Sequence, residues 1–266
     1  MLLGLATYAG FQGQLENFLE FAHQLGMEYI EILAEKPFFS QDLSRKETTN
    51  IRRLLKKLSL TPIVHLPYID INLSSLNPLI REASVKQTKR CLIWAREIGA
   101  SWCVLHCGNV PHDYAPYREE GLRSLKESLV ELISESERLN LLMALENKQK
   151  SKNFELLGFP EDHLNLLKTF NSPFLKVVLD IGHAHTFGLD IVEYLRKVAP
   201  YLIEIHLHDN FGEEDEHLPL GKGSINYLNF LEMWSKLSKK MPLILEMKSF
   251  SDIKECLPRL NKFLRR

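Results

Sequence analysis

The sequence is poor in cysteine and has no long uncharged hydrophobic run. Four cysteines occur among 266 residues and none forms a Cys-x-x-Cys pair, which excludes a disulfide-stapled scaffold and indicates reduced thiols. No uncharged apolar stretch approaches the roughly 18 residues that a membrane span needs. The amino-terminal MLLGLATYAG lacks a cationic leader. We therefore expect a cytoplasmic protein with no membrane partner.

An excess of one charge sign is also absent. Lys and Arg number 33 and Asp and Glu number 34, so the formal net charge is −1. A balanced chain has no overall field that would attract nucleic acid, although a local basic patch can exist within it. The composition therefore disfavours a non-specific DNA-binding protein.

The chain contains neither a linker nor a nucleotide-binding signature. Its 13 glycines and 12 prolines are scattered, with no Ser/Gly-rich or Pro-rich segment between blocks. No Gly-x-Gly-x-x-Gly follows the first apolar run and no P-loop sequence occurs, which disfavours a doubly wound open sheet. We expect a single domain over residues 1–266.

Short apolar runs instead alternate with amphipathic stretches eight times. The apolar runs end at Thr7, Leu33, His65, His106, Glu146, Asp180, His206 and Glu246, about 34 residues apart on average, the size of a βα unit. The amphipathic stretches cover 15–26, 50–58, 83–99, 121–139, 163–170, 190–199, 227–237 and 253–264. Eight βα units predict an α/β fold, the (β/α)₈ TIM barrel. The aromatic residues of 227–237 either pack within the helical shell or pair with a second subunit.

Six of the eight apolar runs end in a residue type that binds metals. These residues are His65, His106, Glu146, Asp180, His206 and Glu246. The strand ends of such a barrel share the face where active sites lie. Three further candidates follow in loops, namely His183, Asp215 and His217. Buried carboxylates need a compensating cation, and imidazoles mixed with carboxylates suit zinc or manganese. The sequence therefore predicts a divalent transition-metal site at this face.

Three polar neighbours of these residues have other expected places. Glu31 lies on the second apolar run and faces either the barrel interior or its mouth. His185 and His208 are expected to support the ligands rather than to bind the metal.

Five motifs carry a resemblance to a known family. LEN at 145–147, LDIGHA at 179–184, HLHDN at 206–210, DEHLPLGKG at 215–223 and LE at 245–246 resemble the xylose isomerase-like barrel superfamily, in family order and over essentially the full chain. That superfamily contains sugar and sugar-phosphate isomerases and epimerases. It also contains endonuclease IV, a zinc enzyme that cuts DNA beside abasic sites. The resemblance implies the barrel and leaves two activities open.

In the isomerase and epimerase branch, the resemblance implies one zinc or manganese ion and a small carbohydrate or sugar phosphate as substrate. Its ligands would be Glu146, Asp180, His206 and Glu246, with Glu146 and Glu246 also acting as the acid/base pair. A metal that chelates a carbonyl and a neighbouring hydroxyl stabilises an enediolate, and the departing proton needs a carboxylate within reach. The remaining residues would contact the substrate: His65, His106, His183, Asp215 and His217, with Lys148 and Lys222 on a phosphate. This activity is the function that we expect.

In the endonuclease branch, the resemblance implies three zinc ions and abasic DNA as the partner. The nine ligands would be His65, His106, Glu146, Asp180, His183, His206, Asp215, His217 and Glu246, and every position carries the right residue type. The chain departs from that pattern after His206, where it reads LHDNF instead of a run of Asn, Asp or Glu, Ser or Ala, and Lys. The loop that follows is also short for a surface that must hold a flipped nucleotide.

Overall fold

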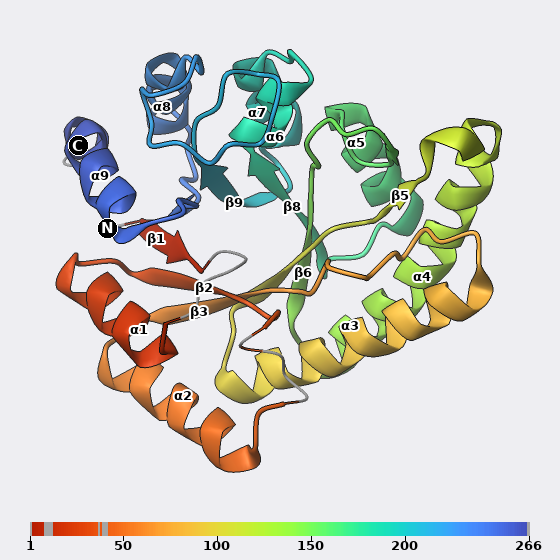
Figure 1. Ribbon diagram of the computed structural model, residues 1–266, viewed down its shortest axis with the longest axis horizontal. Helices are drawn as coiled ribbons and strands as arrows, with labels where there is room; N and C mark the ends of the chain where they lie inside the picture. Colours follow the sequence, from red (N-terminus) through yellow and green to blue (C-terminus); the bar gives the residue numbers. More distant parts are fainter. Residues whose placement is uncertain (1, 8–12, 37, 39–41, 265–266) are drawn as a thin grey trace.

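A closed barrel of parallel strands forms the centre of the computed structural model, which describes residues 2–7, 13–36, 38 and 42–264 (Figure 1). The barrel strands are β1 (Leu3–Ala6), β2 (Tyr29–Leu33), β3 (Thr61–His65), β4 (Trp102–Leu105), β6 (Leu142–Glu146), β8 (Leu175–Asp180), β9 (Leu202–Leu207) and β10 (Leu243–Leu245). They are arranged in the order β1-β10-β9-β8-β6-β4-β3-β2, and each neighbouring pair is parallel. The predicted (β/α)₈ barrel is confirmed.

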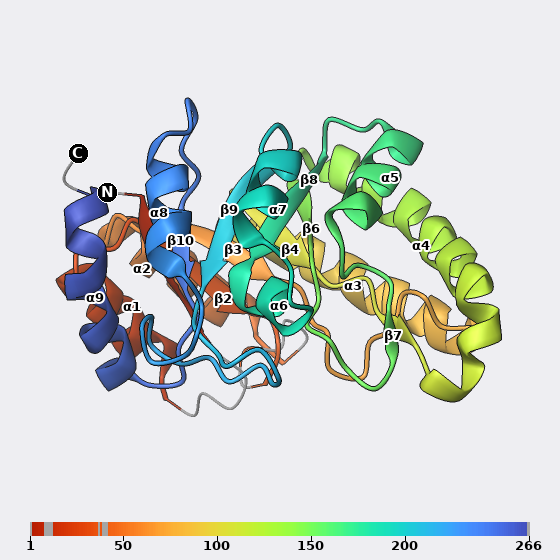
Figure 2. The same cartoon turned by 90° about the horizontal axis from the view of Figure 1, so that it is seen from above.

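Helices surround this barrel, as both views show (Figures 1 and 2). They are α1 (Leu15–Gln24), α2 (Arg45–Lys57), α3 (Pro78–Ile98), α4 (Arg118–Leu139), α5 (Pro160–Phe170), α6 (Ile181–Thr186), α7 (Ile191–Val198), α8 (Tyr227–Ser235) and α9 (Phe250–Leu264). A 3-10 turn, η1 (His112–Tyr117), precedes α4. A small antiparallel pair, β5 (Asn109–Val110) and β7 (Phe154–Glu155), lies outside the barrel. Within the described residues, no helix combines the length and the apolar character required to cross a bilayer.

Local sequence explains where several of these helices begin. Ser44 and Glu47 form a reciprocal capping box at the start of α2. The Asn77 side chain accepts a hydrogen bond from the Leu79 N–H at the start of α3, and Pro78 occupies the first helical position. On α8, Phe230 and Trp234 are buried in the helical shell, which agrees with the first of the two expectations for residues 227–237.

The barrel interior is filled by small and branched side chains. Ala6, Ile63, Val104, Ala144, Val178 and Ile244 form one cluster there. Two carboxylates on barrel strands, Glu31 and Glu204, are fully buried. Glu204 accepts a hydrogen bond from the Trp102 indole nitrogen at 2.5 Å. The barrel interior is therefore a packed core, and the candidate ligand residues lie beyond it at the carboxyl ends of the strands.

Candidate metal centre

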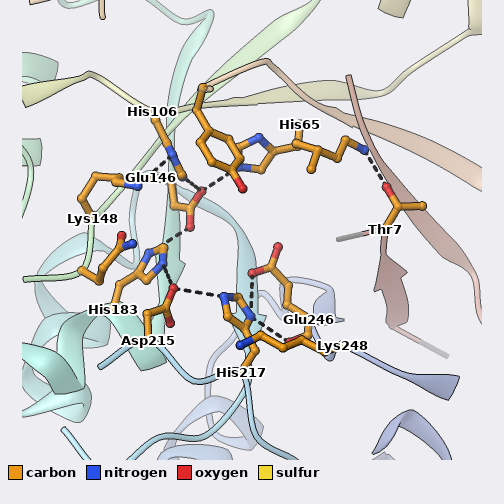
Figure 3. A pocket seen from close by; sticks show the side chains of 13 residues that line it. Thr7, His65, His106, Glu146, Lys148, His183, Asp215, His217, Glu246 and Lys248 are labelled. Carbon is orange, nitrogen blue, oxygen red and sulfur yellow. Dashed lines mark hydrogen bonds and ion pairs between the residues drawn. The ribbon is translucent and has the colours of Figure 1, made fainter. Parts of the chain in front are cut away.

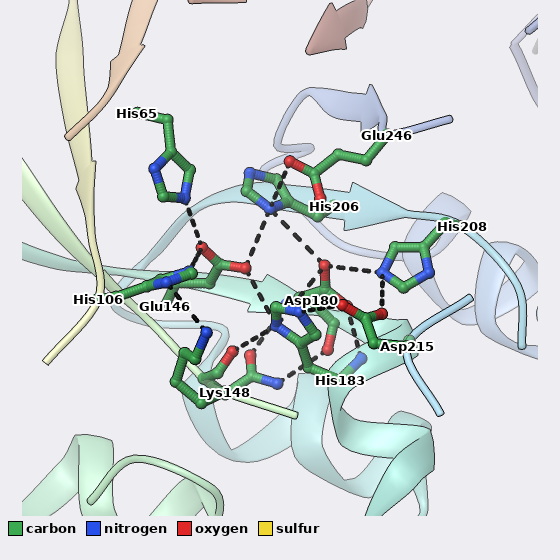
Figure 4. A network of polar contacts seen from close by, with 12 residues as sticks. His65, His106, Glu146, Lys148, Asp180, His183, His206, His208, Asp215 and Glu246 are labelled. Carbon is green, nitrogen blue, oxygen red and sulfur yellow. Dashed lines mark hydrogen bonds and ion pairs between the residues drawn. The ribbon is translucent and has the colours of Figure 1, made fainter. Parts of the chain in front are cut away.

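The nine residues proposed as ligands converge at the carboxyl ends of the barrel strands, eight of them labelled in Figure 4 and His217 in Figure 3. Five of the nine lie within barrel strands or directly after them, at the ends of β3, β4, β6, β8 and β10, and His206 lies one residue before the end of β9. His183 lies on α6, three residues after Asp180, whereas Asp215 and His217 lie in the loop after β9. Residues separated by up to about two thirds of the chain thus share one site because parallel strands end on one face.

Glu146 stands at the centre of a first group with two histidines. Its Oε2 atom lies 3.1 Å from His65 Nε2 and 2.6 Å from His106 Nε2. The Nδ1 atom of His65 donates to the Leu66 carbonyl at 2.8 Å, which leaves Nε2 free for a ligand. His106 differs, because its Nδ1 atom faces the Lys148 ammonium at 3.2 Å. The Lys148 side chain must therefore turn away if His106 Nε2 is to bind a metal.

The second group lies around the Nδ1 atom of His206. This atom is 3.3 Å from Glu146 Oε1, 3.7 Å from Asp180 Oδ2 and 3.4 Å from Glu246 Oε1. On the other side of the ring, Nε2 donates to Glu31 Oε2 at 3.0 Å. Glu31 faces the interior, one of the two places expected for it, and holds the histidine ring so that Nδ1 points at the three carboxylates.

The third group lies around the Asp215 carboxylate. Asp215 Oδ2 is 3.2 Å from His183 Nε2 and 3.0 Å from His217 Nε2. The Nδ1 atoms of these histidines donate to backbone carbonyls, that of His183 to Asn147 at 2.7 Å and that of His217 to Glu246 at 2.9 Å. Both Nε2 atoms are therefore directed toward the carboxylate in the tautomer that a metal ligand needs.

The loop that carries Asp215 and His217 is held by Asp209. The backbone of Asp209 pairs with Leu218 in both directions at 2.8 Å, and its carboxylate accepts from the Gly221 and Ile225 N–H groups at 2.7 and 3.1 Å. Gly223 packs so closely that a Cβ atom there would lie 2.3 Å from the Asn210 carbonyl oxygen. The DN and GKG parts of the motifs therefore shape the loop rather than the chemistry.

Ionisation in the cluster follows from burial and from close pairing. Burial disfavours the charged form of Glu146, but the His106 and His206 imidazoles outweigh it and hold the pKa of this carboxyl well below its ordinary value. The same balance, set by His183 and His208, lowers the pKa of Asp180 to about 2. Burial disfavours the charged form of His217, but Asp215 outweighs it and raises the pKa of this imidazole to about 9. Anionic carboxylates are thus matched by the cationic imidazoles of His183, His206 and His217, whereas burial and the Lys148 ammonium lower the pKa of His106 to about 3.

The donor set and its spacing fit divalent transition ions. Donors about 2.0–2.2 Å from a tetrahedral ion lie roughly 3.3–3.6 Å from one another. The His206 Nδ1 distances of 3.3, 3.4 and 3.7 Å in the second group match this spacing. Mixed imidazole and carboxylate donors suit zinc or manganese, as the sequence predicts.

A cavity of about 260 Å³ opens directly above the cluster (Figure 3). Its walls include His65, His106, Glu146, His183, Asp215, His217 and Glu246 together with Thr7, Leu33, Tyr68, Lys148, Gln149 and Lys248. Tyr68 and Lys248 are not predicted as site residues, because a single residue in a loop beyond a strand end belongs to no repeating pattern in the sequence. Lys222 lies outside this wall, and its ammonium pairs with Glu255 at 2.8 Å.

His208 is also part of the cluster, where we expected a supporting residue. It is fully buried, and its Nε2 atom lies 3.1 Å from Asp180 Oδ2. This contact agrees with a supporting role, but His208 also belongs to a group of four potential ligands with His183, Asp215 and His217.

Comparisons with known proteins relate this barrel to several others. An uncharacterized protein of Methanocaldococcus jannaschii is 28% identical over 99% of this chain and 89% of its own length. A probable endonuclease 4 of Acholeplasma laidlawii is 27% identical over 71% of this chain and 68% of its own length. The crystal structure of a D-tagatose 3-epimerase-like protein superposes with a TM-score of 0.88 at 26% identity, covering 100% of this chain and 97% of that one. The family model described as xylose isomerase-like TIM barrel matches residues 19–265, and the chain belongs to this family.

Proposed function

We propose that the protein is a multi-metal hydrolase of phosphate esters, of the kind represented by endonuclease 4. The observation that carries the proposal is the convergence of nine ligand-type residues around Glu146, the Nδ1 atom of His206 and Asp215, where a one-metal isomerase would need only four of the nine. Similarity to probable endonuclease 4 of Acholeplasma laidlawii supports it further.

In this proposal the nine ligands are divided among three ions. His65 and His106 would hold one ion with Glu146, and Asp180, His206 and Glu246 would hold a second with the other oxygen of Glu146. The third would lie among His183, Asp215 and His217. Ions in the first two groups, which share Glu146, would supply Lewis-acid stabilisation of charge on the phosphoryl oxygens and would lower the pKa of a bound water.

The side chains above the cluster suit an anionic substrate. Lys148 and Lys248 line the cavity and would bind phosphate oxygens as point charges. Burial, together with Glu246 and Glu146, keeps the pKa of Tyr68 well above its ordinary value, so its hydroxyl stays protonated and donates a hydrogen bond. Turning Lys148 toward a phosphate would also free His106 Nδ1 to carry a proton, as a metal-bound imidazole requires.

The test is cleavage of a duplex with one abasic site by the zinc-loaded protein. We expect incision beside the abasic site, loss of incision after chelation and recovery on adding zinc, with an intact duplex left uncut. His185→Ala serves as the control, because His185 does not contact the ligands as the sequence suggested but bonds Ser224 outside the ligand groups. Absence of incision by protein that carries three zinc ions would refute the proposed abasic-site activity.

A sugar epimerase is the second candidate, favoured by the placement of two glutamates. Glu146 and Glu246 approach His206 Nδ1 from different strands, at 3.3 and 3.4 Å, and both line a cavity of monosaccharide size. Two carboxylates on different sides of a substrate can remove and return a proton on opposite faces. The similarity to a D-tagatose 3-epimerase-like protein supports this candidate.

The two candidates differ in their dependence on His106. An epimerase would exchange the proton beside the carbonyl of a ketose or its phosphate with solvent deuterium, and His106→Ala would retain the metal held by Glu146, Asp180, His206 and Glu246. Proton exchange on some ketose together with an uncut abasic duplex would establish the epimerase. Loss of all activity and of more than one metal in His106→Ala would favour the hydrolase.

A further inference from the structure

His208 is held in one orientation beside the third ligand group. It lies two residues after His206, so the period of the strand places both side chains on the same side. Its ring stacks on His217 at 4.0 Å with an interplanar angle of 21°. A Cβ atom at Gly182 would lie only 1.9 Å from His208 Cε1, so glycine is needed at this position to leave room for the ring. Figure 4 shows His208 and Asp215 side by side, next to Asp180.

The Nε2 atom of His208 completes a set of four donors. It lies 3.6 Å from Asp215 Oδ1, while His183 Nε2 and His217 Nε2 lie 3.2 and 3.0 Å from Asp215 Oδ2. Ligand atoms of all four residues lie within 4.8 Å of one another. The two distances to Oδ2 are slightly shorter than the roughly 3.3–3.6 Å between donors on a tetrahedral zinc ion, and His208 approaches the other oxygen of the same carboxylate.

An unpaired oxygen points to the same place. Asp215 Oδ1 is buried, has no hydrogen-bond partner among the residues that the structure describes, and faces His208 Nε2. A buried carboxylate oxygen without a partner is costly unless a cation or a donor meets it. We propose that His208 is a fourth protein ligand of the third ion and closes that site.

This inference rests on the proposed multi-metal function and divides the centre into two parts. Structural zinc sites have four protein ligands, whereas catalytic sites keep a position open for water or substrate. With His208 as a ligand, the third ion would have four protein ligands and no open coordination position. By binding Asp215 and His217, it would hold the loop after β9 in place at the barrel mouth. A substrate would then coordinate only the ions of the first two groups, which share Glu146, and would contact His183, Asp215 and His217 only as parts of the cavity wall.

His208 is expected to contribute less to binding than His217. The Nδ1 atom of His217 donates to a carbonyl at 2.9 Å, whereas Nδ1 of His208 is buried with no partner in the described part of the chain. A hydrogen-bond partner on the ring nitrogen that does not bind the metal typically contributes about 10–100-fold to metal affinity. His217→Ala should therefore weaken the third ion more than His208→Ala does.

The test is zinc content and affinity of the whole protein, measured by competition with a chromophoric chelator. We expect three zinc ions per chain, one of which resists the chelator most. His208→Ala should weaken that ion at least about tenfold and leave the other two unchanged. Cobalt in that site should give the intense visible absorption of four-coordinate cobalt, and this absorption should be lost in the variant. His185→Ala is the matched control and should change neither readout.

His208→Gln separates this role from hydrogen bonding to Asp180. The glutamine amide can still donate to Asp180 Oδ2 but is a poor zinc ligand, so it should behave like alanine. Restoration of zinc binding by glutamine would overturn the inference. So would further weakening of the remaining ions when His208→Ala is added to His217→Ala, because that would place His208 on the second ion. Circular dichroism of each variant checks the fold, and unchanged affinity in a folded variant also overturns the inference.

The zinc readout does not depend on turnover. Protein that binds the third ion through His208 but cleaves no phosphodiester would refute the proposed function and keep the inference. Protein that cleaves abasic DNA with zinc affinity independent of His208 would do the reverse.

Discussion

Replacing Glu146 by glutamine tests the shared centre most directly. The carboxylate contacts four imidazoles, with Oε2 at 3.1 Å from His65 and 2.6 Å from His106, and Oε1 at 3.2 Å from His183 and 3.3 Å from His206. Glu146 belongs to the first and second ligand groups and is absent from the third. We therefore expect Glu146→Gln to reduce zinc from three ions per chain to one. With both substrate-facing ions lost, the rate of phosphodiester cleavage should fall at least about 10³-fold, or about 4 kcal/mol of transition-state stabilisation.

Elemental analysis after gel filtration into metal-free buffer measures this change, together with incision of an abasic duplex. Glu35→Gln is the matched control, because Glu35 is also buried but its Oε1 accepts from the Tyr68 and Ile69 N–H groups, outside every ligand group. It should retain three ions. Retention of all three by Glu146→Gln would refute the shared-ligand arrangement, and loss of all three would show that the third group is not independent.

Three further predictions concern the mouth and the shell. Glu246→Gln removes a ligand at the accessible rim and should abolish turnover with the fold intact by circular dichroism; a wild-type rate would exclude Glu246 from catalysis. If abasic DNA is the substrate, its binding should weaken steeply with salt, and Lys148→Met should reduce the slope of log K against log salt by about 1; equal slopes would exclude a phosphate contact. Burial lowers the pKa of His163 to about 4, below the roughly 6.5 of the unfolded chain, so its contribution to stability is complete above pH 6.5 and is lost as the pH falls toward 4. The loss from pH 7 to 5 is about 2 kcal/mol, and urea unfolding of His163→Gln should lack this component.

Strand ends could be predicted because ligand residues interrupt apolar runs. His65, Glu146 and Asp180 are the last residues of β3, β6 and β8, and His106 follows β4 directly. The barrel topology then brings these residues together without any information on loops.

Features that depend on distant pairing could not be predicted in the same way. Helix α6 has six residues, too few for a helical period, and β5 and β7 have two residues each, paired across more than 40 positions. The ion pair of Lys222 could not be predicted for a similar reason, because its partner Glu255 on α9 lies far from it in sequence. The ion-pair partner of a surface lysine depends on how neighbouring βα units pack against each other. The spacing of residues within one βα unit carries no information on this packing.

The backbone conformation of His217 supports the assignment of the loop residues as additional metal ligands. His217 adopts a φ angle of 53°, in the left-handed region that costs a non-glycine residue roughly 1–2 kcal/mol. This conformation lets the imidazole bond the Glu246 carbonyl through Nδ1 and Asp215 Oδ2 through Nε2, at 2.9 and 3.0 Å. Strain of this kind persists only where the surroundings over-determine it, and it clusters at functional sites. Glu146, Asp180, His206 and Glu246 would serve a one-metal or a three-metal enzyme equally, so the strained loop residue joins His65 and His106 in favouring the larger centre.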